Sequence, residues 1–372
     1  MSDQANWIRC RGLLSWTAVL GITVTMASAA EVPRMMQAIV QRGFGGPDVL
    51  KLERLPVPQP GADQVLVHVY AAGINPLDWR ARMGVRRQDQ GGPAGPREQQ
   101  RTPASGRVGA TSPRLSKPTI PGDEMAGVIA AVGPGVANWH VGEAVYGRSA
   151  GGGDYAQYVT ANSDGIAPKP KRLTFEQAAG IPIAGITAVL AVEQAGVKRG
   201  QTLVIVGAAG GVGSAALQIA KAQGVRVITI AASRHDAYLK QLGADEVVDY
   251  DRENPAEKIM NADAVINLVD GPAAGVLSYV KRGGAIVLPA GLIPRDKCVS
   301  AGVTCNGMDR GNRQKASDLF AQINRLAEAG LFTIKVEKAF PLGQAGQAQE
   351  LDRAGHAEGK IVLITTPAAS EH

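Results

Sequence analysis

The sequence predicts an α/β protein that combines a β-rich domain with a domain built on a doubly wound parallel sheet. Two observations predict this class. From Thr174 to about residue 289, strand and helix patterns alternate, which is typical of a parallel sheet covered by helices on both faces. Before and after that region, short apolar runs separated by Pro and Gly indicate β-rich structure.

The first part of the β-rich domain should extend over residues 36–173. Its early strands are expected at 36–40, 49–55 and 64–73. Residues 84–118 are rich in Pro, Gly, Gln and Arg and lack apolar periodicity, so we expect a mobile insertion there. Later strands are expected at 127–133, 143–147 and 155–160.

The parallel-sheet domain should extend over residues 174–303. Its strands are expected at 202–206, 225–230, 246–249, 262–269 and 284–289, and its helices at 175–179, 188–195, 214–223, 235–242 and 272–281. Residues 304–366 should then return to the β-rich domain. This returning segment is expected to hold a helix at 315–329 and strands at 333–338 and 360–365.

A glycine-rich turn joins the first parallel strand to the helix that follows. The segment Val204–Gly213 reads VIVGAAGGVG, and its turn residues are Gly207, Ala208, Gly210, Gly211, Val212 and Gly213. A strand that turns sharply into a helix directs backbone N–H groups and the positive helix end to one point, and glycine lets a pyrophosphate approach the backbone. With a second strand at 225–230, this unit of about 30 residues predicts a Rossmann dinucleotide site rather than a turn without a ligand.

The end of the second strand bears on the choice of cofactor. An NAD site usually has Asp or Glu there to bind the ribose 2′-hydroxyl. Here Ala231 and Ala232 are followed by Ser233, which can donate a hydrogen bond, and Arg234, which can pair with a phosphate dianion. The sequence therefore favours NADPH. Alternatively, Ser233 is a helix N-cap and Arg234 a solvated charge, although the cap and phosphate roles are compatible.

Composition excludes some classes of function. Hydrophobic residues make up 45% of the 372 residues, which is enough for a sizeable core in two domains. Aromatic residues make up only 4%, which leaves few stacking platforms for nucleic acid. The formal charge of +6 comes mostly from residues 84–118, which hold seven basic and two acidic residues. The remainder is nearly neutral, so we expect no nucleic-acid partner.

The first thirty residues have the pattern of a targeting segment. A basic flank precedes the mostly apolar stretch 13–26, which is short for a membrane span, and residues 27–29 form a small-residue cleavage pattern. We expect residues 1–30 to be a Sec-type signal peptide, so that the mature protein is periplasmic or secreted and has no stable membrane span. The alternatives are a retained anchor, or a cytoplasmic protein whose true start lies at Met35 or Met36.

Cleavage of this segment would leave two cysteines, Cys298 and Cys305. An even number of cysteines in an exported protein suggests a disulfide, and two unrelated thiols are the alternative. The bond can close only if the chain turns back on itself between the two residues.

Motifs along residues 36–366 resemble the medium-chain dehydrogenase/reductase superfamily, specifically its zinc-independent quinone oxidoreductase-like branch. They occur in the family's order: AAGINPLDW (71–79), IPGDEMAGVIAAVGPGV (120–136), GDYAQYV (153–159), IPIAGITA (181–188), VIVGAAGGVG (204–213), LGADEVVDY (242–250) and GKIVLIT (359–365). The resemblance implies a GroES-like catalytic domain at 36–173 and 304–366 and a Rossmann NADP-binding domain at 174–303. The family's counterpart of residues 84–118 is usually much shorter.

The resemblance also bears on zinc. Zinc-dependent members of the superfamily place Cys at the position of Asn75 and His at the position of Asp123, and only Glu124 of that signature is present here. Asn and Asp do not replace Cys and His in a tetrahedral zinc site. We therefore expect no metal, and reduction of an activated acceptor rather than alcohol oxidation.

The resemblance implies roles for further residues. The Asn that matches Asn75 lies near the nicotinamide and the acceptor carbonyl, where its amide can hydrogen-bond either group; an Asx-turn before Pro76 is the alternative. Three positions match residues near the cofactor, namely Thr187 at the nicotinamide, Tyr250 at the 2′-phosphate, and Lys360. Asn267 and Leu268 replace an Asp-Thr pair that the family has on the strand edge facing the cofactor, so this chain departs from the family's nicotinamide contacts there.

Together these features predict an NADPH-dependent, zinc-independent oxidoreductase that transfers a hydride to a quinone or an α,β-unsaturated carbonyl compound. No catalytic acid is evident, so Tyr146 and Tyr155 are the nearest candidates for a proton donor and solvent is the alternative. Other hypotheses are a zinc-free alcohol dehydrogenase or enoyl reductase, and an NADPH-binding sensor or degenerate paralogue without turnover. The expected partner is a small-molecule acceptor, and a homodimer follows only by analogy with the family.

Overall fold

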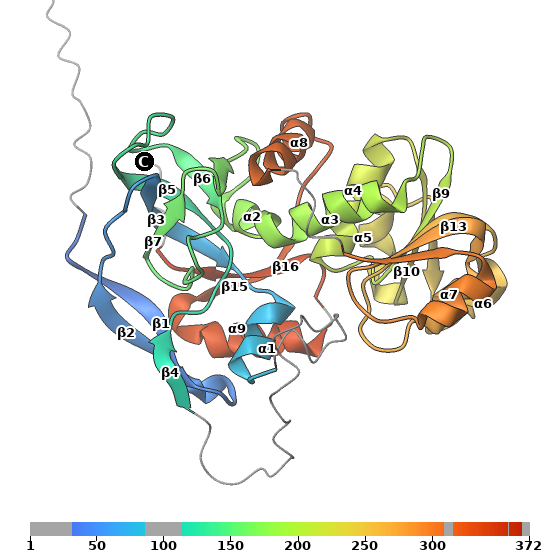
Figure 1. Ribbon diagram of the computed structural model, residues 1–372, viewed down its shortest axis with the longest axis horizontal. Coiled ribbons are helices and arrows are strands. Elements are labelled where there is room, and N and C mark those ends of the chain that lie inside the picture. The colour runs from blue at the N-terminus through green and yellow to red at the C-terminus, as the bar shows by residue number, and fades with distance from the viewer. Residues whose placement is uncertain (1–31, 86–113, 309–314, 356, 367–372) are drawn as a thin grey trace, which may run out of the picture.

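The computed structural model describes residues 32–85, 114–308, 315–355 and 357–366. Two sheet-containing parts lie toward opposite ends of the long axis, and helices α2 (Phe175–Ala179) and α3 (Ile181–Ala195) lie between them (Figure 1). The predicted signal segment 1–30 and residues 86–113 of the predicted insertion fall outside the described residues. No helix in the described ranges is long and apolar enough to cross a membrane.

The parallel sheet has six strands in the order β11-β10-β9-β12-β13-β14. These strands are β9 (Thr202–Val206), β10 (Arg226–Ala231), β11 (Glu246–Asp249), β12 (Ala262–Asn267), β13 (Val280–Leu288) and β14 (Thr304–Gly307). All neighbouring pairs are parallel. The chain starts at β9, moves outward through β10 and β11, and then crosses to β12, so the strand order reverses beside β9. Doubly wound sheets bind their ligands at such a switch point.

Side chains of the central strand alternate between two cores. Leu203 and Ile205 lie in the core that includes residues of α3, α4 (Gly211–Ala222) and α5 (Asp236–Gln241), whereas Val204 lies in the core on the opposite face. That second face is covered by α6 (Pro255–Lys258), the 3-10 helix η4 (Ala274–Ser278) and α7 (Arg295–Ala301). Helices on both faces confirm the predicted fold class.

The β-rich part contains two sheets. The larger has the order β15-β16-β3-β5-β6-β8, with β7 paired to β3. Its strands are β3 (Gln64–Gly73), β5 (Met125–Val132), β6 (Ala144–Gly147), β7 (Tyr158–Asn162), β8 (Ile166–Pro168), β15 (Val336–Pro341) and β16 (Lys360–Ile364). The smaller sheet, β2-β1-β4, is formed by β1 (Met35–Gly43), β2 (Leu50–Pro56) and β4 (Arg114–Thr119).

Strand β4 corrects part of the expectation for residues 84–118. Residues 114–118 were predicted to belong to the mobile insertion, but they form most of a strand that pairs antiparallel with β1. The backbone groups along the second edge of β1 offer hydrogen-bond partners to this segment, and such pairing can override a sequence that lacks apolar alternation.

The final segment begins differently from the prediction. Residues 304–307 form β14, the sixth strand of the parallel sheet, so this sheet continues beyond the predicted boundary at residue 303. Helix α8 (Ala316–Glu328) then packs Phe320 and Ile323 into a core that also includes residues of the parallel sheet and of the larger sheet of the β-rich part. Helix α9 (Ala345–Ala354) packs against α1 (Pro76–Arg82), and the two lie side by side in Figure 1.

The remaining turns of helix are short. They are η1 (Pro47–Val49), η3 (Ser233–His235) and η5 (Leu342–Gln344). Within the predicted helix 272–281, only the five residues of η4 are helical. Pro272 and Gly275 account for this difference, because proline removes a backbone donor and glycine disfavours a helix interior.

Cys298 in α7 and Cys305 in β14 form a disulfide, with their Cα atoms 6.1 Å apart. Helix α7 ends at Gly302, whose φ of 67° lies in the left-handed region, and the chain then turns back into β14. The sequence predicts that the chain must turn back between Cys298 and Cys305 for this bond to form, and it does so here.

Candidate active site

A cleft of about 1880 Å³ lies between the two parts of the molecule, at the carboxyl ends of the parallel strands. Its walls include the turn after β9, the ends of β10 and β12, the start of α1 and the first residue of β16. Ten of the residues expected at the site line it, namely Asn75, Thr187, Gly207, Gly210, Gly211, Val212, Gly213, Arg234, Tyr250 and Lys360. The cleft therefore coincides with the switch point of the sheet.

The geometry of the glycine turn fits a pyrophosphate. Gly207 has φ of 79°, a conformation that favours glycine. A Cβ atom on Gly210 would meet only one atom within 4 Å, so the backbone there is open to the cleft, whereas a Cβ atom on Gly213 would lie 2.6 Å from Ala208 Cα. Gly213 thus allows α4 to pack closely on β9, and the first N–H groups of α4 have no partner within the helix. Ala208 is fully buried and serves this packing.

The residues expected at the 2′-phosphate lie after β10 and β11. Arg234 is exposed and lines the cleft, and Tyr250, which is 53% exposed, lines it too. Ser233 begins the 3-10 turn η3 and is half-buried; it is not among the described residues that line the cleft. The described geometry thus offers a cation and a phenol to a phosphate at this end of the cleft.

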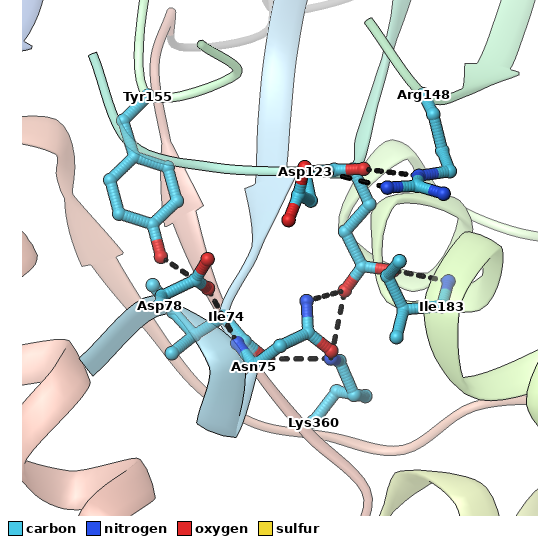
Figure 2. A network of polar contacts seen from close by, with 9 residues as sticks. Ile74, Asn75, Asp78, Asp123, Arg148, Tyr155, Ile183 and Lys360 are labelled. Carbon is cyan, nitrogen blue, oxygen red and sulfur yellow. Dashed lines mark hydrogen bonds and ion pairs between the residues drawn. The ribbon is translucent and has the colours of Figure 1, made fainter. Parts of the chain in front are cut away.

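Asn75 also lines the cleft and lies in a buried polar network (Figure 2). Its Nδ2 donates to Glu124 Oε1 at 2.8 Å, and its Oδ1 accepts from Lys360 Nζ at 2.6 Å. Because a carboxylate only accepts and an ammonium only donates, these two partners fix the orientation of the amide. Asn75 also precedes the first turn of α1, and its second Nδ2 proton has no acceptor among the described residues.

Lys360 and Glu124 form the buried charge pair of this network, with Nζ 2.8 Å from Oε1. Lys360 Nζ also donates to the carbonyl oxygen of Ile74 at 2.6 Å, and Glu124 Oε2 accepts from the backbone N–H of Ile183 at 2.7 Å. The ammonium thus donates to two oxygens and forms an ion pair with a third within the protein. Lys360, expected near the cofactor, lines the cleft with its ammonium committed to holding Asn75 and Ile74.

Asp78 supports Asn75 from the first turn of α1. Its Oδ2 accepts from the backbone N–H of Asn75 at 2.7 Å and from the Tyr155 hydroxyl at 2.8 Å (Figure 2). Burial raises the pKa of the Asp78 carboxyl to about 7, although both hydrogen bonds act in the opposite direction. The three-residue spacing of Asn75 and Asp78 is that of a helix-capping box, and this signal was available in the sequence.

The structure does not place Tyr146 or Tyr155, the candidates for a proton donor, at the cleft. Both side chains are fully buried, and neither is among the described residues that line the cleft. The Tyr146 hydroxyl donates to Asn324 Oδ1 at 2.8 Å, and the Tyr155 hydroxyl donates to Asp78. Burial raises the pKa of each phenol, so neither readily ionises.

The positions that match zinc ligands do not fit that metal. Asp123 forms an ion pair with Arg148, its Oδ1 lying 3.4 Å from Nη2, and the Asn75 amide is held by Glu124 and Lys360. Among the described residues, no group of three or more His, Cys, Asp or Glu side chains could hold a metal ion. An amide and an ion-paired carboxylate are not a tetrahedral zinc donor set.

Asn267, which replaces a family Asp, is occupied by the protein itself. Its side chain is buried, and Nδ2 donates to the carbonyl oxygens of Val269 at 2.8 Å and Ala290 at 2.9 Å. The residue thus joins the loops that follow β12 and β13 at the cleft edge.

Three charged residues at the cleft were missed by the sequence analysis. Arg80 of α1 forms an ion pair with Asp270 of the loop after β12, and this contact crosses between the two domains. Asp352 of α9 also lines the cleft and accepts a hydrogen bond from Trp79 Nε1 at 3.0 Å. These contacts join segments that are far apart in the chain, so no local sequence pattern could predict them.

Two family models match the chain. The alcohol dehydrogenase GroES-like domain matches residues 61–171, and the zinc-binding dehydrogenase model matches residues 242–363. The NADPH-dependent alkenal/one oxidoreductase, chloroplastic, of Arabidopsis thaliana is 31% identical over 92% of this chain and 83% of its own length. The quinone oxidoreductase of Sus scrofa is 31% identical over 89% of this chain and 98% of its own length.

Solved structures give the same result. The quinone oxidoreductase from Coxiella burnetii matches with a TM-score of 0.75 and 31% sequence identity, covering 89% of this chain and 100% of that chain. An alcohol dehydrogenase superfamily protein from Novosphingobium aromaticivorans has the same TM-score of 0.75 at 29% identity.

Proposed function

This chain belongs to the medium-chain dehydrogenase/reductase superfamily, in its quinone oxidoreductase-like branch, and from this premise we propose that it is an NADPH-dependent, zinc-independent reductase. Its acceptor is an α,β-unsaturated carbonyl compound or a quinone. These two acceptor classes are the ones in the names of the relatives from Arabidopsis thaliana and Sus scrofa.

One observation carries the proposal: the glycine turn before α4, Arg234 and Asn75 all line a single cleft. The open backbone at Gly210 and the N–H groups at the start of α4 suit the pyrophosphate of a dinucleotide. When bound, the reduced nicotinamide supplies the hydride. The protein has to bind the two partners, orient them and exclude water.

Asn75 is the residue that we assign to the acceptor. Glu124 and Lys360 hold its amide so that Oδ1 is occupied and one Nδ2 proton remains unused among the described residues. That N–H can donate to the acceptor carbonyl oxygen as negative charge develops on it. A donor that is already oriented needs no reorganisation during the reaction, which is the condition for useful electrostatic stabilisation.

Arg234 and Tyr250 support NADPH rather than NADH. Strand β10 ends at Ala231, so no carboxylate is placed there for a ribose 2′-hydroxyl, and the exposed guanidinium of Arg234 can pair with the 2′-phosphate. Zinc independence is supported by the two positions that match zinc ligands: the Asn75 amide donates to Glu124, and Asp123 is paired with Arg148.

Wild-type protein tests the proposal directly. NADPH oxidation is followed at the nicotinamide absorbance with an enone and with a quinone, and NADPH and NADH binding are measured by fluorescence titration. We expect turnover of at least one acceptor and tighter binding of NADPH than of NADH. Binding without turnover would favour a sensor or degenerate paralogue, and failure to bind either nucleotide would refute the cofactor assignment.

A further inference from the structure

Reduction of an enone consumes a proton as well as a hydride, and Asn75 can supply hydrogen bonds but not that proton. Among the described residues, three carboxyl groups have a pKa raised chiefly by burial, namely Asp78, Asp154 and Asp352. Asp154 is fully buried and accepts a hydrogen bond from the Ser149 hydroxyl, and Asp78 accepts from the Asn75 backbone N–H and from the Tyr155 hydroxyl. Of the three, Asp352 lines the cleft.

Asp352 lies near the end of α9, the helix that packs against α1. The Trp79 indole donates to its Oδ2 at 3.0 Å, and the carboxyl accepts no second hydrogen bond from the described residues. Trp79 thereby holds the carboxyl in place through one oxygen and leaves the other available to a ligand in the cleft.

Asp352 is linked to the Asn75 network through α1, because its donor Trp79 lies on the helix that follows Asn75. Burial raises the pKa of its carboxyl. Lys360 of β16, the Trp79 hydrogen bond and Arg80 of α1 lower this pKa, and Glu124 raises it, but burial outweighs the three lowering contributions. Lys360 hydrogen-bonds Asn75 directly, so its charge acts on both residues. Other charged groups lie on α9 and on elements packed against it: Glu350 and Arg353 on α9, Asp78 and Arg82 on α1, Asp48 on η1, and Glu337 and Lys338 on β15.

We propose that Asp352 is the acid that protonates the reduced acceptor, a step that rests on the proposed function for its hydride. Addition of a hydride to the β-carbon of an enone moves the C=C electron pair toward the carbonyl and gives an enolate. The O–H bond of the Asp352 carboxyl then breaks, its proton forms the new C–H bond at the α-carbon, and the product is the saturated ketone. Asp352 remains as a carboxylate and recovers its proton from water at the cleft.

Asp352→Asn tests the assignment in the full chain, because the amide oxygen can still accept from Trp79. General acid catalysis typically contributes about 10²-fold or more, so we expect kcat with an enone to fall by about that factor while NADPH affinity is retained. The wild-type rate should fall as pH rises through the pKa of Asp352, and this limb should be absent in the variant. Asp318→Asn, a matched change on the exposed face of α8, should keep the wild-type pH profile.

A second readout needs neither cofactor nor acceptor. With Trp7, Trp16 and Trp139 changed to Phe, Trp79 is the only tryptophan of the chain. Because its indole donates to Asp352, its emission should change as that carboxyl ionises, with a midpoint above the usual aspartate range of about 4. Adding Asp352→Asn to this background should abolish the transition.

Two results would overturn the assignment: an Asp352→Asn enzyme with wild-type turnover and an unaltered pH profile, or a Trp79 emission curve that Asp352→Asn does not change. The first outcome would make solvent the proton source. A wild-type protein that binds NADPH and oxidises none of it with any acceptor would refute the proposed function, and with it the need for a proton donor.

Discussion

Lys360→Met is expected to destabilise the folded protein by about 3–5 kcal/mol, because it leaves one charge of a buried pair without its partner. Lys360 Nζ lies 2.8 Å from Glu124 Oε1, and Glu124 is fully buried. The same ammonium donates to Asn75 Oδ1 and to the Ile74 carbonyl oxygen, so these two acceptors lose a donor when Glu124 loses its counter-charge. Methionine keeps most of the apolar volume of the lysine stem, so the loss is electrostatic rather than a cavity effect.

The two donors that remain on Glu124 determine where in that range the loss of stability should fall. Glu124 keeps the Asn75 amide and the Ile183 N–H as donors, which places the cost near the lower limit, at about 3 kcal/mol. In the double variant with Glu124→Gln the orphaned charge is gone, so a large part of the stability should return.

Urea unfolding at pH 7 measures these free energies. Lys240→Met is the matched control, since Lys240 pairs with Asp236 on the exposed side of α5 with side chains 61% and 44% exposed. This surface pair should contribute less than about 1 kcal/mol. A cost of less than about 1 kcal/mol for Lys360→Met, or no recovery in the double variant, would refute the view that the charge pair holds the cleft wall together.

Two further predictions concern stability and the glycine turn. Asp154 is fully buried and burial raises its pKa to about 8, so the folded state binds the proton more tightly than the unfolded state and stability falls as pH rises from about 4 to 8. Asp154→Asn should remove this loss, which amounts to about 1.4 kcal/mol per pKa unit. Urea unfolding at pH 5 and pH 8 should show that the free energy of unfolding of the variant rises relative to that of the wild type at the higher pH. Parallel pH profiles of the two proteins would contradict this prediction. Gly213→Ala should cost about 1–3 kcal/mol because its Cβ would meet the Ala208 backbone at 2.6 Å, whereas Gly210→Ala should keep its stability and weaken NADPH binding; equal stability of the two variants would contradict the packing argument.

Much of the fold could be predicted because its signals are local. The strands expected at 64–73, 202–206 and 246–249 have those bounds in the structure, since apolar runs end at glycine, proline or polar residues. The glycine turn lies in the cleft for the same reason: strand, turn and helix are consecutive in the chain. Strand β4 and helix α9 depend instead on partners elsewhere, and α9 buries only a narrow stripe that includes Ala345, Ala348 and Gln349.

The candidate site could be predicted only in part. Motif order placed Asn75 near the acceptor side, but the amide is held by Glu124 and Lys360, which come from segments far away in sequence. Tyr146 lies in a predicted strand and Tyr155 in a motif, yet both are buried away from the cleft, because neither kind of pattern states which face each side chain takes. No sequence pattern predicted that Asp352 lies at the cleft, since the carboxylate of a residue in a polar helix is usually exposed to solvent.

The central claim is that one cleft binds NADPH and that Asn75 orients the acceptor within it. The most direct measurement is NADPH oxidation with an enone by the wild type and by Asn75→Ala, together with the NADPH dissociation constant of each. We predict that the variant loses at least about tenfold in kcat, the loss of one oriented donor, while its NADPH affinity stays within about threefold of the wild type. Unchanged turnover would remove Asn75 from the mechanism, and a parallel loss of NADPH binding would show that the residue supports the fold of the cleft rather than the reaction.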